Sequence, residues 1–127
     1  MPKQSPRDPM RAPLPQRLFG ASGALLAAAA TALAAYAAHG AEGEVRAHLY
    51  MAALFAFGNG IGLAALAARV GGRLGLLALA ALLAGTLVFA GSLVSAKLLG
   101  EPTMAAPWGG GLMIAGWLLL AADRLRR

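Results

Sequence analysis

Four long stretches without an ionised side chain constrain this chain more than any other feature. An α-helix rises about 1.5 Å per residue, so about 20 residues cross a hydrocarbon core of about 30 Å. In hydrocarbon every backbone amide and carbonyl must be paired within the chain, which makes segments of this length helical. We therefore expect an all-α membrane protein, a bundle of four transmembrane helices. The predicted spans are Leu18–Ala38, Leu49–Ala68, Leu74–Ala96 and Met104–Ala122.

The small number of charged residues argues against a soluble domain and against a nucleic-acid-binding protein. Only 13% of the 127 residues are charged, against roughly 25% in an average soluble domain. The net charge of +6 comes from basic residues beside the apolar spans, without the aromatic and basic interleaving of a nucleic-acid surface. We expect no nucleic-acid partner. The chain has no cysteine, which excludes disulfides and thiolate metal sites.

The basic residues also predict an orientation. Nine of the 11 lysines and arginines lie in the N-terminal segment, the turn between the second and third spans, and the C-terminal segment. Cytoplasmic segments of membrane proteins are enriched in lysine and arginine. Both termini are therefore expected inside, in the cytoplasm. The composition is rich in Ala, Gly, Arg and Leu, as GC-rich bacterial genomes encode, and the four spans predict a multi-pass protein.

Three segments follow from these spans: residues 1–17 as a disordered cytoplasmic tail, 18–122 as the four-helix domain, and 123–127 as a basic cytoplasmic tail. Five of the seven prolines lie in Met1–Gln16, and proline removes a backbone donor and disfavours helix at the residue before it. A cleaved signal peptide is the competing interpretation of the first span. Its apolar run is longer than the roughly 7–15 residues of a signal peptide, so we favour retention.

Small residues within the spans predict close helix contacts, because glycine lets two helix backbones approach in a membrane. Twelve of the 17 glycines lie inside the four spans. Gly58 and Gly62 form a GxxxG pair, and Gly91 with Ser95 forms a weaker one. Packing within the bundle is favoured over a subunit interface. The expected packing residues are Gly58, Gly62, Gly85, Gly91, Gly110 and Gly116.

The candidates for ligand binding are three polar residues at membrane depth, Asn59, Ser92 and Ser95, and His39 beside the first external loop. An amide facing lipid is costly, so Asn59 is expected to bond to another helix. Ser92 and Ser95 are expected to bond to their own helix backbone.

Two histidines, His39 and His48, bracket the first external loop, close to Glu42 and Glu44. Nothing in the sequence fixes the geometry of these four residues, so we expect no metal site. No HExxH, GxSxG, P-loop or Rossmann motif occurs. We therefore expect neither a cofactor nor an enzyme.

The last two spans carry a family resemblance in the stretches GTLVFAGSL, with Gly85 and Phe89, and APWGGGLMIAGW, with Pro107 and Trp117. With Ala37-Ala38-His39-Gly40 at the end of the first span, they resemble the bacterial family called domain of unknown function 423, related to the eukaryotic transmembrane protein 256 family. The resemblance runs from about Leu18 to Ala122 and implies a four-helix inner-membrane fold without an assigned activity. The family's aromatic-Gln-x-x-His pattern is replaced here by Phe55-Ala56-Phe57-Gly58-Asn59.

Two functions are compatible with these features. The favoured one is an accessory or structural component of a membrane protein assembly, because the loops are short and no charge lies within a span. The alternative is a small oligomeric transporter or channel for an ion or small solute. The expected partners are the lipid bilayer and other membrane subunits or further copies of the chain.

Overall fold

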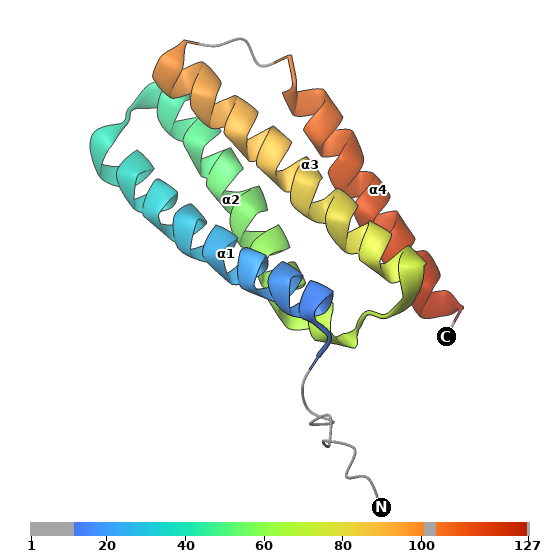
Figure 1. Cartoon of the computed structure of the whole chain (residues 1–127). Coiled ribbons are helices and arrows are strands. Elements are labelled where there is room, and N and C mark those ends of the chain that lie inside the picture. Colours follow the sequence, from blue (N-terminus) through green and yellow to red (C-terminus); the bar gives the residue numbers. More distant parts are fainter. Residues whose placement is uncertain (1–11, 101–103, 127) are drawn as a thin grey trace, which may run out of the picture.

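The computed structural model describes residues 12–100 and 104–126, which form four α-helices and a short 3-10 turn (Figure 1). The elements are α1 (Leu14–Gly40), α2 (Gly43–Leu66), η1 (Ala67–Arg69), α3 (Gly72–Leu99) and α4 (Ala106–Leu125). Within the two described ranges there is no β-strand, so the all-helical prediction is confirmed.

Three helices are long and apolar enough to cross a membrane: α1, α2 extended by η1, and α3. Each is 27 or 28 residues long. By the same measure α4 does not qualify: its 20 residues are long enough, but they include three glycines in a row and Asp123, which lower its mean hydropathy. The fold is thus compatible with a small, multi-pass integral membrane protein.

The helices extend beyond the predicted spans at several ends. Helix α1 begins at Leu14, inside the segment expected to be a disordered tail. Proline is tolerated in a first helical turn, where its missing amide has no partner to lose, so Pro15 does not prevent this start. Helix α4 likewise continues to Leu125, three residues into the segment expected to be a basic tail. Residues 1–11 lie outside the described part of the chain.

The loop expected between His39 and His48 is the largest difference. Helix α1 continues to Gly40 and α2 begins at Gly43, so the connection consists of Ala41 and Glu42. Both histidines therefore lie in helices. Gly43 has a φ of +60°, a conformation that glycine adopts at no steric cost, and this permits the tight reversal.

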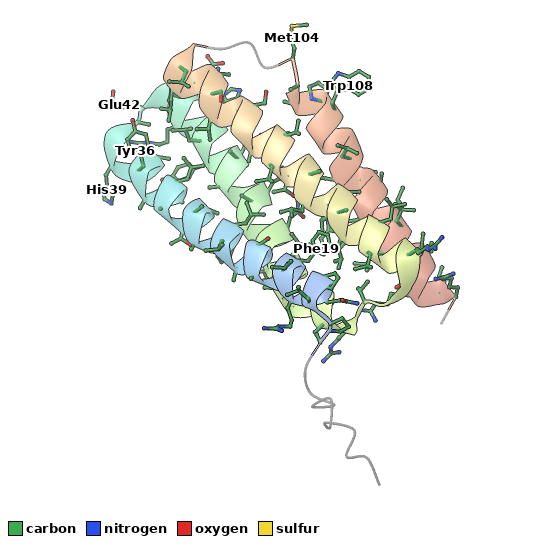
Figure 2. The ribbon with its side chains drawn as sticks, in the orientation of Figure 1. Phe19, Tyr36, His39, Glu42, Met104 and Trp108 are labelled. Carbon is green, nitrogen blue, oxygen red and sulfur yellow. The ribbon has the colours of Figure 1, made fainter. Side chains whose placement is uncertain are left out.

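The helices pack as two antiparallel hairpins, α1 with α2 and α3 with α4, joined by the contact between α2 and α3 (Figure 1). The start of α1, the η1 turn and the end of α4 lie together at one end of the bundle, which we call the arginine end. At the opposite end, the glutamate end, α1 passes into α2. His39 and Glu42 lie there, and so do Met104 and Trp108 beside the start of α4 (Figure 2).

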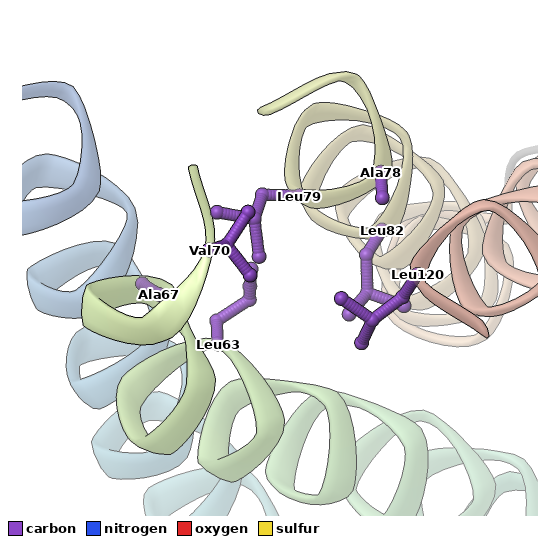
Figure 3. Close-up of a cluster of buried hydrophobic side chains, with 7 residues drawn as sticks. All are labelled: Leu63, Ala67, Val70, Ala78, Leu79, Leu82 and Leu120. Atoms are coloured by element: carbon purple, nitrogen blue, oxygen red, sulfur yellow. The ribbon is translucent and has the colours of Figure 1, made fainter. Parts of the chain in front are cut away.

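The main core lies near the arginine end, where α2, the turn after it, α3 and α4 meet (Figure 3). Its buried residues are Leu63, Ala67, Val70, Ala78, Leu79, Leu82 and Leu120. Outside this core the surface is apolar: Leu25, Leu54 and Leu118 are each about two-thirds exposed. Such a surface suits hydrocarbon, which solvates apolar side chains as well as a protein interior does.

Candidate functional site

A hydrogen-bonded group of four side chains lies between α2, α3 and α4, with Asn59, Thr86 and Met113 buried and Trp117 39% exposed; we call it the Asn59 cluster. The Asn59 amide donates to Thr86 Oγ1 at 2.9 Å and to Met113 Sδ at 3.0 Å. The indole Nε1 of Trp117 donates to Asn59 Oδ1 at 3.0 Å. Asn59 thus bonds across helices, as its position within an apolar span predicts. One amide therefore links three helices.

Neighbouring residues position Thr86 and Trp117 for these bonds. Thr86 donates its own hydroxyl to the carbonyl of Leu82 at 2.6 Å, one turn earlier in α3, which leaves Oγ1 free to accept from Asn59. Gly62, one turn after Asn59, gives the indole room, because an added Cβ would lie 2.9 Å from the Trp117 ring. On one face of α2, Gly62 therefore leaves space for the Trp117 ring and Asn59 accepts its hydrogen bond.

The chemistry of the cluster is that of a structural link. Amide, hydroxyl, thioether and indole groups carry no charge near neutral pH, so the four residues include no acid, base or activated nucleophile. Both amide hydrogens of Asn59 and its oxygen are bonded within the cluster. Since an unpaired amide in an apolar interior costs several kcal/mol, of order 2–7, the cluster favours this one arrangement of α2, α3 and α4.

The other three ligand-binding candidates are not gathered around Asn59. His39 lies in the last turn of α1 with its side chain exposed. The Ser92 hydroxyl is buried and makes no hydrogen bond within the described part of the chain, which differs from the expected bond to its own helix. Ser95 contributes its backbone carbonyl, which accepts from the Gly100 amide and ends α3.

Arg46 explains the short connection at the glutamate end. Its Nε donates to the carbonyls of Ala37 at 3.0 Å and Ala41 at 2.8 Å, and its Nη2 donates to Ala38 at 3.3 Å. The last carbonyls of a helix lack partners within the helix and form the negative end of its dipole. The Arg46 guanidinium, which belongs to α2, therefore supplies hydrogen bonds to the carbonyls at the end of α1. These bonds hold the two helices in a tight hairpin.

Glu44, one of the two acidic residues near the histidines, makes contacts of another kind. Glu44 forms an ion pair with Lys97 at 3.2 Å, and its backbone carbonyl lies 2.9 Å from His48 Nδ1. Across the described ranges, three or more histidine, aspartate or glutamate side chains nowhere converge in a way that could hold a metal ion.

Two buried polar residues at the arginine end were missed because sequence reasoning assigned them to the tails. Gln16 is 7% exposed and donates to the Val70 carbonyl at 3.0 Å. Asp123 is fully buried. Its Oδ1 lies 3.7 Å from Arg126 Nη2, and its Oδ2 lies 3.1 Å from the place of a Cβ on Gly75. The spacing of Asp123 and Arg126, one helical turn apart, was the available signal.

Of the six predicted packing glycines, three lie at helix contacts and three do not; Gly62, beside the Trp117 ring, is one of those at a contact. An added Cβ on Gly85 would lie 2.6 Å from the Met113 amide, and one on Gly116 would lie 2.8 Å from the Leu82 amide, so both are at the α3–α4 contact. Gly58, Gly91 and Gly110 have nothing within 4 Å. Within the described bundle these three are not packing residues, because they face away from the neighbouring helices.

No protein-family model matches this chain, and no solved structure matches it. The resemblance to domain of unknown function 423 therefore stays a prediction that rests on the residues quoted for it.

Proposed function

We propose that this chain is an inner-membrane protein with four transmembrane helices and both termini in the cytoplasm, and that it is a non-catalytic accessory component of a membrane protein assembly. The assembly role rests on a contrast between the interior of the bundle, where polar groups are paired, and its surface, where some glycines have no neighbour. The polar groups of the Asn59 cluster are paired with each other, whereas outward-facing glycines on α2, α3 and α4 leave open space.

Two features support α4 as the fourth span. At about 1.5 Å per residue, its 20 residues are about 30 Å long, the thickness of a hydrocarbon core. It also lies against α3 (Figure 1), so it shares the membrane depth of a helix that is apolar enough to span. Its exposed side chains include Ile114 and Leu118, which suit contact with lipid.

The charges of the two ends support the orientation. The described arginines Arg17, Arg69, Arg73, Arg124 and Arg126 belong to segments at the arginine end. Glu42 and Glu44 belong to the opposite end. Because positive residues gather on the cytoplasmic side, the arginine end faces the cytoplasm.

The assembly role is favoured over transport by what the interior lacks. Ion and solute pathways are lined by polar or charged groups that face a cavity. In the described part of the chain the groups of the Asn59 cluster bond to each other, and the buried carboxylate of Asp123 lies beside Arg126 at the arginine end. The polar groups of the Asn59 cluster are thus used in bonds between helices and are not free to line a pathway.

The assembly role predicts a protein partner that contacts an open glycine face. A tagged chain is purified from native membranes in mild detergent, and co-purifying proteins are quantified by mass spectrometry. Gly58→Leu, Gly91→Leu and Gly110→Leu fill the open faces, and Ala28→Leu adds similar bulk to an exposed position of α1. We expect a reproducible partner that at least one glycine variant loses and Ala28→Leu retains.

Two results would contradict this role. The first is a lone chain, with no partner enriched over an untagged control in repeated purifications. The second is solute or ion flux into liposomes that hold the purified chain, which would favour the transport alternative.

A further inference from the structure

An apolar hollow of about 330 Å³ lies between α1 and α3 near the arginine end. Its lining consists of Leu14, Pro15, Leu18, Phe19, Ser22 and Leu83. Figure 2 places Phe19 where the first turns of α1 pass α3. Phe19 and Leu83 also pack against the main core, so the floor of the hollow is a fixed part of the bundle.

The hollow has the depth of one leaflet. Leu14 and Ser22 are eight residues apart on α1, which corresponds to about 12 Å at about 1.5 Å per residue. Half of a hydrocarbon core of about 30 Å is about 15 Å. The stretch of α1 that lines the hollow is therefore nearly as long as the hydrocarbon part of one leaflet is thick, so the hollow is long enough for much of one acyl chain.

Each of the two helices that line the hollow carries an exposed arginine near its start, at the arginine end of the bundle. Arg17 lies on α1 between the lining residues Leu14 and Leu18, and Arg73 is the second residue of α3, the other wall. Both are exposed, and neither is ion-paired within the described ranges. Asp123, a buried acid at this end, lies beside Arg126. Each of the two helices that line the hollow therefore carries an exposed arginine in its first turn.

A larger hollow of about 490 Å³ between α1 and α2 lacks this combination. Its lining is apolar and aromatic apart from Thr31, whose hydroxyl bonds to Ala27 at 2.9 Å. Arg46, near the start of α2, is engaged with the carbonyls at the end of α1. Of these two hollows, the one at the arginine end is thus the one that combines an apolar floor with exposed arginines that have no ion pair within the described ranges.

We propose that the hollow at the arginine end holds one acyl chain of an anionic phospholipid of the cytoplasmic leaflet, whose phosphate is bound by Arg17 and Arg73. Hydrogen bonds between arginine and phosphate are charge-assisted and stronger than neutral ones, and basic residues at the cytoplasmic surface attract anionic lipids. The lipid site rests on the proposed transmembrane placement and is independent of the accessory role.

Native mass spectrometry of the purified full-length chain tests the site, with phosphatidylglycerol or phosphatidylcholine of identical acyl chains added to the detergent. We expect tighter binding of phosphatidylglycerol. The variant Arg17→Gln/Arg73→Gln should lose roughly fivefold in affinity for each arginine. Arg124→Gln, which removes an exposed charge from α4 at the same end, should bind as the wild type does.

A second variant tests the apolar part of the site. Ser22→Phe fills the hollow without a change of charge and should weaken phosphatidylglycerol binding, while circular dichroism verifies that each variant keeps its helices. Equal binding of the two lipids, equal losses in the Arg124→Gln control, or wild-type binding by either test variant would overturn the proposal. Competition by inorganic phosphate at the concentration of the lipid would also overturn it, because the site would then bind a free anion.

Discussion

Gly23 and Gly60 hold α1 and α2 in backbone contact. A Cβ on Gly23 would lie 2.5 Å from the carbonyl oxygen of Gly60, and a Cβ on Gly60 would lie 2.6 Å from the carbonyl oxygen of Gly23. Helices in a membrane associate through such close packing, because lipid is as apolar as their side chains. The predicted first span, Leu18–Ala38, has 11 alanines among 21 residues, so its position depends on this contact.

Gly60→Ala is expected to separate α1 from α2, because the added methyl group cannot fit between the two backbones. Overpacking of this kind costs about 1–3 kcal/mol. Gly58→Ala is the matched control: nothing lies within 4 Å of its added Cβ, and alanine favours helix over glycine by about 1 kcal/mol. The free energy of unfolding in mixed micelles should fall for Gly60→Ala only. Equal stability of the two variants would show that the backbones do not touch at Gly60.

Asn59→Leu is expected to release Trp117 as well as to weaken the contact between α2 and α3. Hydrogen bonds between helices in membranes contribute about 0.6 kcal/mol on average, with a maximum near about 1.7, so we expect a loss of about 1–2 kcal/mol for the cluster. In a Trp108→Phe background Trp117 is the remaining tryptophan. Its emission should shift to shorter wavelengths, because its N–H loses the amide oxygen.

Thr31→Val is the control for this measurement, since the Thr31 hydroxyl bonds only within α1. It should change neither the emission of Trp117 nor the stability by more than a few tenths of a kcal/mol, the usual range of an exposed substitution. An unchanged emission maximum in Asn59→Leu would disprove the bond between Trp117 and Asn59.

Arg46→Gln is expected to loosen the turn between α1 and α2. Hydrogen bonds to charged groups contribute about 1.5–3 kcal/mol, and the Arg46 guanidinium reaches three carbonyls at the end of α1. Lys97→Gln removes an ion pair with Glu44, whose side chain is 76% exposed, and exposed pairs contribute only about 0–1 kcal/mol. Hydrogen exchange of the Ala37–Ala41 amides should accelerate in the first variant alone. Similar protection in both would contradict the cap.

The sequence predicts the four helices well because uncharged runs of this length have no other stable form in hydrocarbon. It misplaces their ends because distant residues decide them. The start of α1 is held by Gln16, which bonds to Val70, and the end of α1 is held by Arg46. Neither contact follows from local composition.

The candidate site shows the same division. The position of Asn59 predicts a partner on another helix, but the identity of Thr86 and Trp117 as partners depends on how each helix is rotated. Gly58 and Gly60 differ by about 200° around α2 at about 3.6 residues per turn, and only Gly60 contacts a neighbour. Since these helices are apolar on all sides, hydrophobic periodicity does not show which face of α2 contacts a neighbour. Gly58 was therefore expected at a helix contact, and Gly60 was not.

The orientation and the fourth span are tested by single cysteines, since the natural chain has none. Ser5→Cys and Arg127→Cys should react with a membrane-impermeant maleimide only after the cells are permeabilised. Glu42→Cys and Thr103→Cys should react in spheroplasts with intact inner membranes. Labelling of positions 103 and 127 from the same side would show that α4 does not cross the membrane. Labelling of positions 5 and 42 from the same side would remove α1 as a span, and a chain that lacks position 5 altogether would show that the first span is cleaved.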